Sequence, residues 1–314
     1  MLVYLLFCLG LILLLVGGDL LVKGAVGLAE KFGISPLIIG LTIVALGTSA
    51  PELLISLQAA LGGSGELAVG NVVGSNIANV LLVLGLPAII ASISSNDKSI
   101  HGTLFFLIGL TAIFMWQMYA SPISRMDGFL LLLLLTAFLV QQFIHARRSK
   151  EAVDDYHDEI GAVPGANWKI IASLIAGIVA LPIGADLTVD ASVEIARRWM
   201  IDEEVIGLTI IAIGTSLPEL ATGVMAARHN NTSVAIGNVV GSNFFNIAAI
   251  MGATAFIAGD VTVGAHIIGF DMWVMLAATL ILIALPLFSL TIGRKGGILL
   301  IGAYIAYLIS TAAM

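Results

Sequence analysis

A segment of this chain occurs twice. Residues 39–53 read IGLTIVALGTSAPEL and residues 206–220 read IGLTIIAIGTSLPEL, and the run GNVVGSN stands at 70–76 and again at 237–243. All of these matches share one offset of 167 residues, and 24 of the 48 positions in the aligned window around them are identical without a gap. A single long offset predicts a fold made of two structurally related halves.

The composition indicates that both halves lie in a lipid bilayer. The chain is 59% hydrophobic and 11% charged, its mean hydropathy is +1.09, and a soluble domain carries about a quarter charged residues. The net charge of −7 comes without a basic face, so nucleic acid is not an expected partner. We expect an all-α polytopic membrane protein with ten transmembrane helices, near 2–28, 35–61, 66–92, 101–119, 127–145, 168–196, 204–227, 234–257, 269–289 and 296–313.

One hydrophilic stretch, 146–167, divides the ten predicted helices into two sets of five. Because five is an odd number, the second set enters the bilayer from the opposite side, which makes the repeat inverted. The predicted domains are a first repeat over 1–145 with its motif at 38–85, a cytoplasmic linker, and a second repeat over 168–314 with its motif at 205–252.

The distribution of basic residues predicts the orientation. With the N-terminus outside, the three outer basic residues are Arg125, Arg197 and Arg198. Ten basic residues then lie inside, as the positive-inside rule requires, namely Lys23, Lys31, Lys98, Arg147, Arg148, Lys150, Lys169, Arg228, Arg294 and Lys295. We expect a multi-pass protein of the cell membrane with both termini extracellular and 146–167 in the cytoplasm.

Two glutamates stand at equivalent positions of the repeat, inside predicted spans. Glu52 and Glu219 each follow a Gly-Thr-Ser-x-Pro sequence. A charged residue at membrane depth costs about 3 kcal/mol on insertion scales, so such residues are retained for function. Pro51 and Pro218 lack an N–H and predict broken helices, which are tolerated at this depth only beside a cavity. Carbonyl oxygens are expected to be freed near 45–48 and 212–215.

Neighbouring polar side chains share a helix face with the glutamates, because residues three or four apart are adjacent on a helix. All are hard oxygen donors, and neither histidine nor cysteine stands among them, which argues against zinc or copper. Full dehydration at such a site favours Ca²⁺ or Na⁺ over Mg²⁺. The set comprises Thr48, Ser49, Ser75, Asn79, Thr215, Ser216, Ser242 and Asn246.

The charge of the predicted site favours exchange. Two carboxylates with a total charge of −2 are neutralised by one Ca²⁺ or by two Na⁺. Without bound cations the charge of −2 opposes the change of access from one side of the membrane to the other.

Other polar residues have simpler interpretations. Asp19 and Asp186 also match at the 167-residue offset and predict capping or supporting hydrogen bonds, and the five histidines, at helix ends or in loops, predict solvated side chains: His101, His145, His157, His229 and His266.

The paired GTSAPE and GTSLPE segments, each followed by GNVVGSN and a further asparagine, resemble the two alpha repeats of the cation/Ca²⁺ antiporter superfamily. The prokaryotic sodium/calcium exchanger branch is the most similar, and the resemblance covers the whole chain. It implies that the second and third helices of each half form a core around the ions. The first helix of each half would slide across that core during alternating access.

The resemblance also implies roles for individual residues. Glu52 and Glu219, with the carbonyls of Thr48 and Thr215, would bind Ca²⁺. Flanking Na⁺ sites would use Ser49, Ser75 and the Ala45 carbonyl in one half, and Ser216, Ser242 and the Ala212 carbonyl in the other. Asn79 and Asn246 would face the central site. Some relatives, including potassium-dependent exchangers, carry aspartate at the position of Asn246, so the amide argues against potassium transport.

The expected function is secondary active Na⁺/Ca²⁺ antiport by alternating access, with electrogenic Ca²⁺ export driven by Na⁺ entry. Proton/calcium antiport through the same glutamates stays open, although that branch usually shows GNxxE where this chain has GTSxPE. A passive cation channel is the alternative from another class. No cofactor and no obligate protein partner are expected. An enzyme is not expected, since the chain shows no nucleotide-binding glycine loop and no nucleophile–histidine pair.

Overall fold

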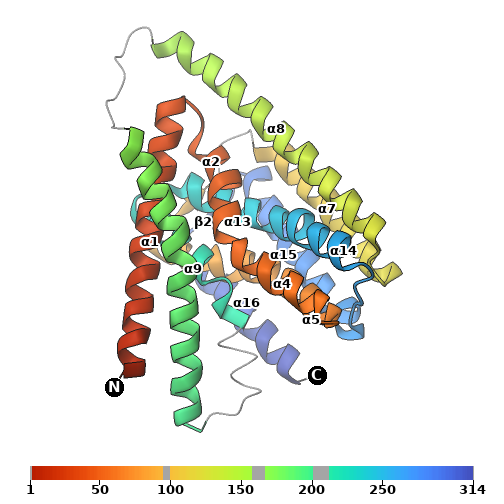
Figure 1. Cartoon of the computed structure of the whole chain (residues 1–314). Helices are drawn as coiled ribbons and strands as arrows, with labels where there is room; N and C mark the ends of the chain where they lie inside the picture. Colours follow the sequence, from red (N-terminus) through yellow and green to blue (C-terminus); the bar gives the residue numbers. More distant parts are fainter. Residues whose placement is uncertain (1, 95–99, 158–166, 201–211, 314) are drawn as a thin grey trace.

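The structure, a computed structural model, describes residues 2–94, 100–157, 167–200 and 212–313. Within these ranges, eight helical segments are each long and apolar enough to cross a membrane, and one bent helix pair forms a ninth span. The remaining predicted span, 204–227, is described only from Ala212 onward. The prediction of an all-α polytopic protein is therefore confirmed (Figure 1).

The first half begins with one long straight helix, α1 (Leu2–Phe32). The second span is broken into α2 (Pro36–Ile39), a π-helical turn η1 (Gly40–Val44), α3 (Ala45–Thr48) and α4 (Ala50–Leu61). The third combines α5 (Gly65–Ala78), the π-helical turn η2 (Asn79–Val83) and α6 (Gly85–Ile90). The half ends with α7 (Ile100–Ala120) and α8 (Arg125–His157).

The second half follows the same order. It contains α9 (Asn167–Arg198), α11 (Ala212–Gly214), α12 (Leu217–Arg228), α13 (Thr232–Phe245), the π-helical turn η4 (Asn246–Met251), α14 (Gly252–Ala258), the π-helical turn η5 (Ile267–Asp271), α15 (Met272–Leu287) and α16 (Arg294–Ala313). The two π-helical turns at Asn79 and Asn246 are 167 residues apart, so the repeat extends to this local irregularity.

The helices that open the two halves, α1 and α9, run in opposite directions side by side (Figure 1). Glycines let their backbones approach closely, as is common between membrane helices. A Cβ atom on Gly184 would lie 3.0 Å from the Gly10 carbonyl oxygen, and one on Gly177 would lie 2.8 Å from the Gly17 carbonyl oxygen. Gly10 corresponds to Gly177 and Gly17 to Gly184 at the 167-residue offset, so exchanging the two halves converts one contact into the other. The interface therefore has an internal two-fold relationship, as an inverted repeat requires.

Both breaks predicted from Gly-Thr-Ser-x-Pro are present. The second span bends by 46° between its two parts, and the break falls at Ser49, with φ −87° and ψ 8°. In the second half α12 begins after Ser216, with φ −88° and ψ 5°. Each proline then stands in the first turn of the new helix, where its missing N–H would have had no helical partner.

Two features of the connections were not predicted. The helix α8 continues to His157 instead of ending near 145, because 146–157 contains good helix formers and neither glycine nor proline. A short antiparallel ladder joins β1 (Ile93–Ser94) to β2 (Thr291–Ile292), between the segments that follow α6 and precede α16. The use of 146–167 as a linker stays a prediction, and 158–166 lie outside the described residues.

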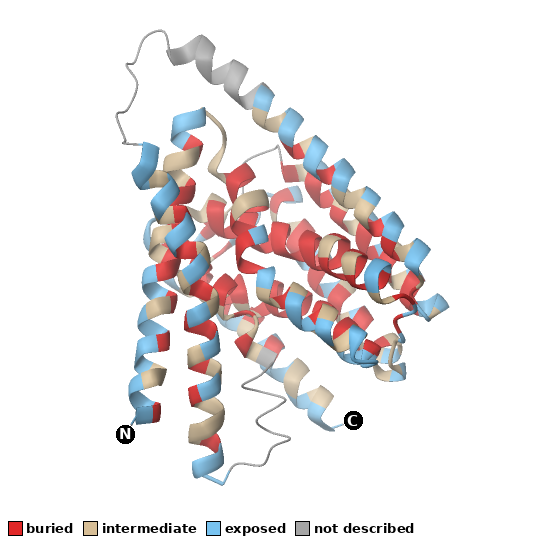
Figure 2. Ribbon diagram, viewed as in Figure 1, coloured by how far each residue is buried: buried red, intermediate tan, exposed pale blue. Residues whose placement is uncertain are grey.

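Burial is concentrated in the middle of the molecule. Figure 2 shows buried residues throughout α13 and on the inner faces of its neighbours, while exposed residues follow the outer faces of α1, α8 and α9. Apolar side chains that face outward are expected where the surrounding solvent is lipid. Ser49 and Ser216, which stand at the two breaks, are buried, although Leu46 and Ala50 beside the first break are exposed.

Candidate functional site: two buried glutamates at the repeat interface

The two breaks bring the halves into polar contact at the centre. The Ser49 hydroxyl, at the α3–α4 junction, donates a hydrogen bond of 3.0 Å to Glu219 Oε1 on α12. The adjacent Thr48 hydroxyl is 3.3 Å from Asn238 Oδ1 on α13. These contacts span 170 and 190 residues of sequence. The predicted polar face of the first half therefore faces the second half.

Both glutamates are almost completely buried, with 1% of each residue exposed. Glu52 Oε2 and Glu219 Oε2 have no hydrogen-bond partner in the part of the chain that the structure describes. Among the described residues, no lysine, arginine or histidine forms an ion pair with either carboxylate. A buried carboxylate without a countercharge is expensive, so a bound cation would stabilise this arrangement.

Several further predicted ligands are buried, and their side-chain oxygens are unpaired within the described residues. In the described part of the protein, four of these buried atoms lack a partner, namely Ser216 Oγ, Ser242 Oγ, Asn79 Oδ1 and Asn246 Oδ1. Ser75 is also buried, and Thr215 is partly buried. Hydroxyl and amide oxygens are the neutral donors that Na⁺ and Ca²⁺ accept.

The hydrogen bonds at the first break show which of the carbonyls expected near 45–48 loses its helical donor. The Ala45 carbonyl accepts the Ser49 N–H at 3.0 Å and the Thr48 hydroxyl at 3.3 Å, so the break does not free it from hydrogen bonds. The carbonyl that loses its helical donor is that of Gly47, four residues before Pro51. Of Ala212, only the backbone at the start of α11 is described.

No group of three or more His, Cys, Asp or Glu side chains gathers anywhere within the described residues. Additional ligands for a cation at the two glutamates would therefore be neutral oxygens from the surrounding helices. A hard-oxygen site with a formal charge of −2 stays the prediction for these residues.

Comparison with known proteins identifies the family. The family model described as "Sodium/calcium exchanger protein" matches residues 2–144 and 169–312. The chain belongs to the sodium/calcium exchanger family. Members of this family are transporters, and the residues that the model omits correspond closely to the hydrophilic stretch between the halves.

Individual relatives match this exchanger-family protein over nearly its whole length. The sodium/calcium exchanger MaX1 of Methanosarcina acetivorans is 31% identical over 98% of this chain and 97% of its own. The inner membrane protein YrbG of Escherichia coli is 36% identical over 95% of this chain and 93% of its own. A solved structure of the sodium-calcium exchanger NCX_Mj superimposes with a TM-score of 0.82 and 32% identity, covering 99% of this chain and 98% of that one. The predicted class of two inverted repeats in a ten-helix membrane fold is thereby confirmed.

Sequence reasoning missed several polar residues of this exchanger-family protein. Asn76 and Asn243 are buried, and their occurrence in the duplicated GNVVGSN could have revealed them. Asp271 is also buried and contacts His266 Nδ1 at 2.8 Å and the Tyr307 hydroxyl at 3.0 Å. Its counterpart in the first half is a leucine, so a search for matched residues could not find it.

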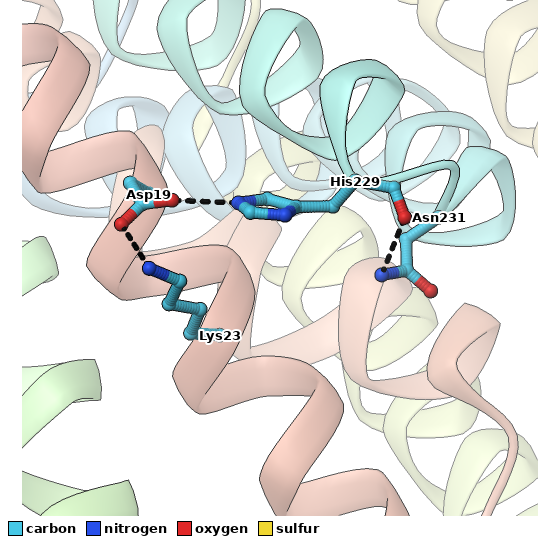
Figure 3. Close-up of polar contacts among 4 residues, drawn as sticks. All are labelled: Asp19, Lys23, His229 and Asn231. Carbon is cyan, nitrogen blue, oxygen red and sulfur yellow. Dashed lines mark hydrogen bonds and ion pairs between the residues drawn. The ribbon is translucent and has the colours of Figure 1, made fainter.

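A second polar cluster ties α1 to the end of α12. Asp19 Oδ1 lies 2.6 Å from His229 Nε2, and Asp19 Oδ2 lies 2.7 Å from Lys23 Nζ (Figure 3). Asp19 thus has a supporting contact, as predicted. Of the histidines, which were predicted to be solvated, His229 is exposed and also contacts Asp19. His266 is partly buried and contacts Asp271, five residues along the chain.

Proposed function

We propose that this chain is a secondary active Na⁺/Ca²⁺ antiporter that works by alternating access. The observation that carries the proposal is the burial of two carboxylates, one from each half, each with an oxygen that no described residue partners. Relatives over nearly the whole chain are named as sodium/calcium exchangers, which supports the choice of ions.

Electrostatics favour one divalent or two monovalent cations. Glu52 and Glu219 carry −2 together, and no basic side chain of the described chain pairs with them. One Ca²⁺ or two Na⁺ neutralises this charge, and a third Na⁺ would leave the loaded site at +1. The two loads then compete for the same oxygens, and the uncompensated site is disfavoured in the buried interior. Competition between alternative loads is the physical basis of exchange.

The neutral oxygens divide into two flanks. We propose that Ser49, Ser75 and the Ala45 carbonyl bind Na⁺ beside Glu219 in one flank, while Ser216, Ser242 and the Ala212 carbonyl do so in the other. Thr48 and Thr215 would complete the Ca²⁺ site through their carbonyls, and Asn79 and Asn246 would face its centre. The unpaired hydroxyls of Ser216 and Ser242 support this assignment in the second flank.

The charge distribution supports an orientation with both termini outside and 146–167 in the cytoplasm. With the inward Na⁺ gradient of a cell as the energy source, the exchanger would export Ca²⁺. A load of three Na⁺ for one Ca²⁺ would move net charge and make transport electrogenic. The same oxygens accept protons, so proton/calcium antiport is the competing proposal, and a passive cation channel is the proposal from another class.

The experiment that tests this function is ⁴⁵Ca²⁺ uptake into proteoliposomes preloaded with Na⁺. The outer buffer is either free of Na⁺ or matched to the interior, and a proton ionophore is present throughout. We expect uptake only with the outward Na⁺ gradient. Uptake driven by a pH gradient instead, once the ionophore is omitted, would establish proton coupling. Uptake that follows only the Ca²⁺ gradient, without any counter-ion, would establish a channel.

A further inference from the structure

We propose that Asn76 is a positioning residue, which turns the amide of Asn246 so that its oxygen faces the transported cation. The inference deepens the proposed function and rests on Asn246 contributing to the central site. Asn76 does not itself touch the cation in this proposal. It acts through the side chain of Asn246, across the interface between the halves.

The contacts form a short relay of buried groups. Asn246 Nδ2 donates to Asn76 Oδ1 at 3.5 Å, and Asn76 Nδ2 points to the sulfur of Met275 at 3.8 Å. All three residues are 1% exposed. Asn246 Oδ1 has no partner among the described residues. The NH₂ end of this amide is therefore turned to Asn76, and its oxygen end is left unpaired.

The orientation of an amide decides whether it attracts or repels a cation. The oxygen end carries partial negative charge and two lone pairs, while the NH₂ end presents two donor hydrogens. In a buried site an unanchored amide can turn either end to the ion. An acceptor placed behind the NH₂ group fixes the productive orientation, as outer-shell partners orient ligands in metal sites.

The other half lacks this relay although it has the same motif. Asn243, the counterpart of Asn76, is equally buried, yet neither of its amide atoms has a partner among the residues described. The position equivalent to Met275 is Ile108, which offers no sulfur acceptor. The relay is therefore specific to Asn76, and the repeat supplies Asn243 as a matched control.

The test compares Asn76→Ala with Asn243→Ala in the full-length protein. Ca²⁺ binding is measured by equilibrium ⁴⁵Ca²⁺ binding to purified protein in detergent, and KM and kcat are measured in proteoliposomes. We expect Asn76→Ala to weaken Ca²⁺ binding and raise KM by about 3- to 10-fold, the change expected on losing one neutral hydrogen bond, with a smaller change in kcat. Asn243→Ala should bind as the wild type does.

A second background separates orientation from general structural support. Asn246→Asp places an oxygen at both ends of the side chain, so no acceptor is needed to orient it. In that background, Asn76→Ala should leave Ca²⁺ binding within about 2-fold, a coupling that a double-mutant cycle measures directly. An equal loss in both backgrounds would overturn the proposal, as would equal losses for Asn76→Ala and Asn243→Ala.

Folding and function are controlled separately. If Asn76→Ala is not recovered as a folded protein, Met275→Leu removes the sulfur acceptor at nearly constant volume, and we expect a smaller weakening of Ca²⁺ binding. Binding unchanged by Met275→Leu would then overturn the relay. Because binding is measured without transport, a wild-type protein whose uptake ignores Na⁺ would refute the antiport proposal and still allow the binding comparison.

Discussion

Ser49 and Ser216 occupy the same position in two copies of one motif, yet they make different contacts. Their backbone angles agree within a few degrees. Ser49 donates to Glu219 in the opposite half at 3.0 Å, whereas Ser216 Oγ has no partner within the described residues, and neither does Glu52 Oε2. Equal sequence has thus produced equal local structure but unequal contacts between the halves.

The asymmetry extends to the helices behind the breaks. Asn71 Nδ2 contacts the Ser56 hydroxyl at 2.9 Å and the Glu52 carbonyl at 3.3 Å, both within its own half. Its counterpart Asn238 instead contacts Thr48 of the other half. Alternating access in inverted-repeat transporters is a rocking of one repeat against the other around a fixed site. Two halves that differ in one conformation are what such a mechanism requires.

The largest expected effect comes from the two buried glutamates, one in each half. Glu52→Gln and Glu219→Gln each remove one of the two negative charges, and a charged partner contributes about 1.5–3 kcal/mol. We expect Ca²⁺ affinity to fall roughly 10- to 100-fold, measured by ⁴⁵Ca²⁺ uptake. Glu66→Gln makes the same chemical change at an exposed position and should retain uptake. Retained exchange in both site variants would refute the site.

The serine pair gives the sharpest test of the asymmetry. Ser49→Ala leaves Glu219 Oε1 without its donor and should lower stability by about 1–3 kcal/mol, whereas Ser216→Ala removes a hydroxyl that has no partner and should be nearly neutral. Thermal unfolding of each variant is followed in detergent without Ca²⁺ or Na⁺. Equal changes in Tm would show that the asymmetry is not a property of the ion-free protein.

A glycine pair tests how closely α13 approaches the first half. A Cβ atom on Gly241 would lie 2.5 Å from the Leu41 carbonyl oxygen and 2.6 Å from the Ala45 side chain. Gly241→Ala should therefore cost about 1–3 kcal/mol through overpacking, seen as a lower Tm. At the counterpart Gly74, no described atom lies within 4 Å of such a Cβ. If Gly74→Ala were equally destabilising, the close approach would not be special to α13.

The smallest expected effect concerns the first helix of each half. Asp19 pairs with Lys23 and His229, but the equivalent Asp186 stands four residues before another acid, Asp190. Asp19→Asn should lower stability by about 0.2–1 kcal/mol, and Asp186→Asn should raise it by about 0.2–0.5 kcal/mol by removing a like-charge neighbour. Denaturation in low salt measures both, and changes of the same sign would contradict this comparison.

Much of the fold was predictable because a bilayer restricts what a chain can do. Backbone groups in lipid must be satisfied within a helix, so apolar runs of the right length predicted the spans closely, as with 101–119 and α7. The helical continuation of α8 was missed because hydropathy does not indicate whether a charged, hydrophilic segment continues a helix. The β1–β2 ladder was missed because two-residue strands leave no periodicity.

The sequence predicts the candidate site as a set of residues. Glu52 and Glu219 stood out because an acidic residue inside a span is costly, and its occurrence at the same position of both repeats indicates a function. Asp271 has the same cost, but it has no counterpart and it follows the start of its span closely, so the repeat did not reveal it. Asn76 is part of the duplicated motif, but its hydrogen bond with Asn246, on which its proposed role depends, is visible only in the structure.

By itself the sequence determined the number of spans, their inversion and the positions of both breaks, because these follow from local composition and from a repeat of fixed offset. Only the tertiary structure decided which oxygens meet. Ser49 reaches Glu219 while Ser216 stays unpaired, and Asn246 turns to Asn76 while Asn243 has no partner. The physical reason is that contacts between the halves depend on their relative placement, which the two copies of the motif do not specify.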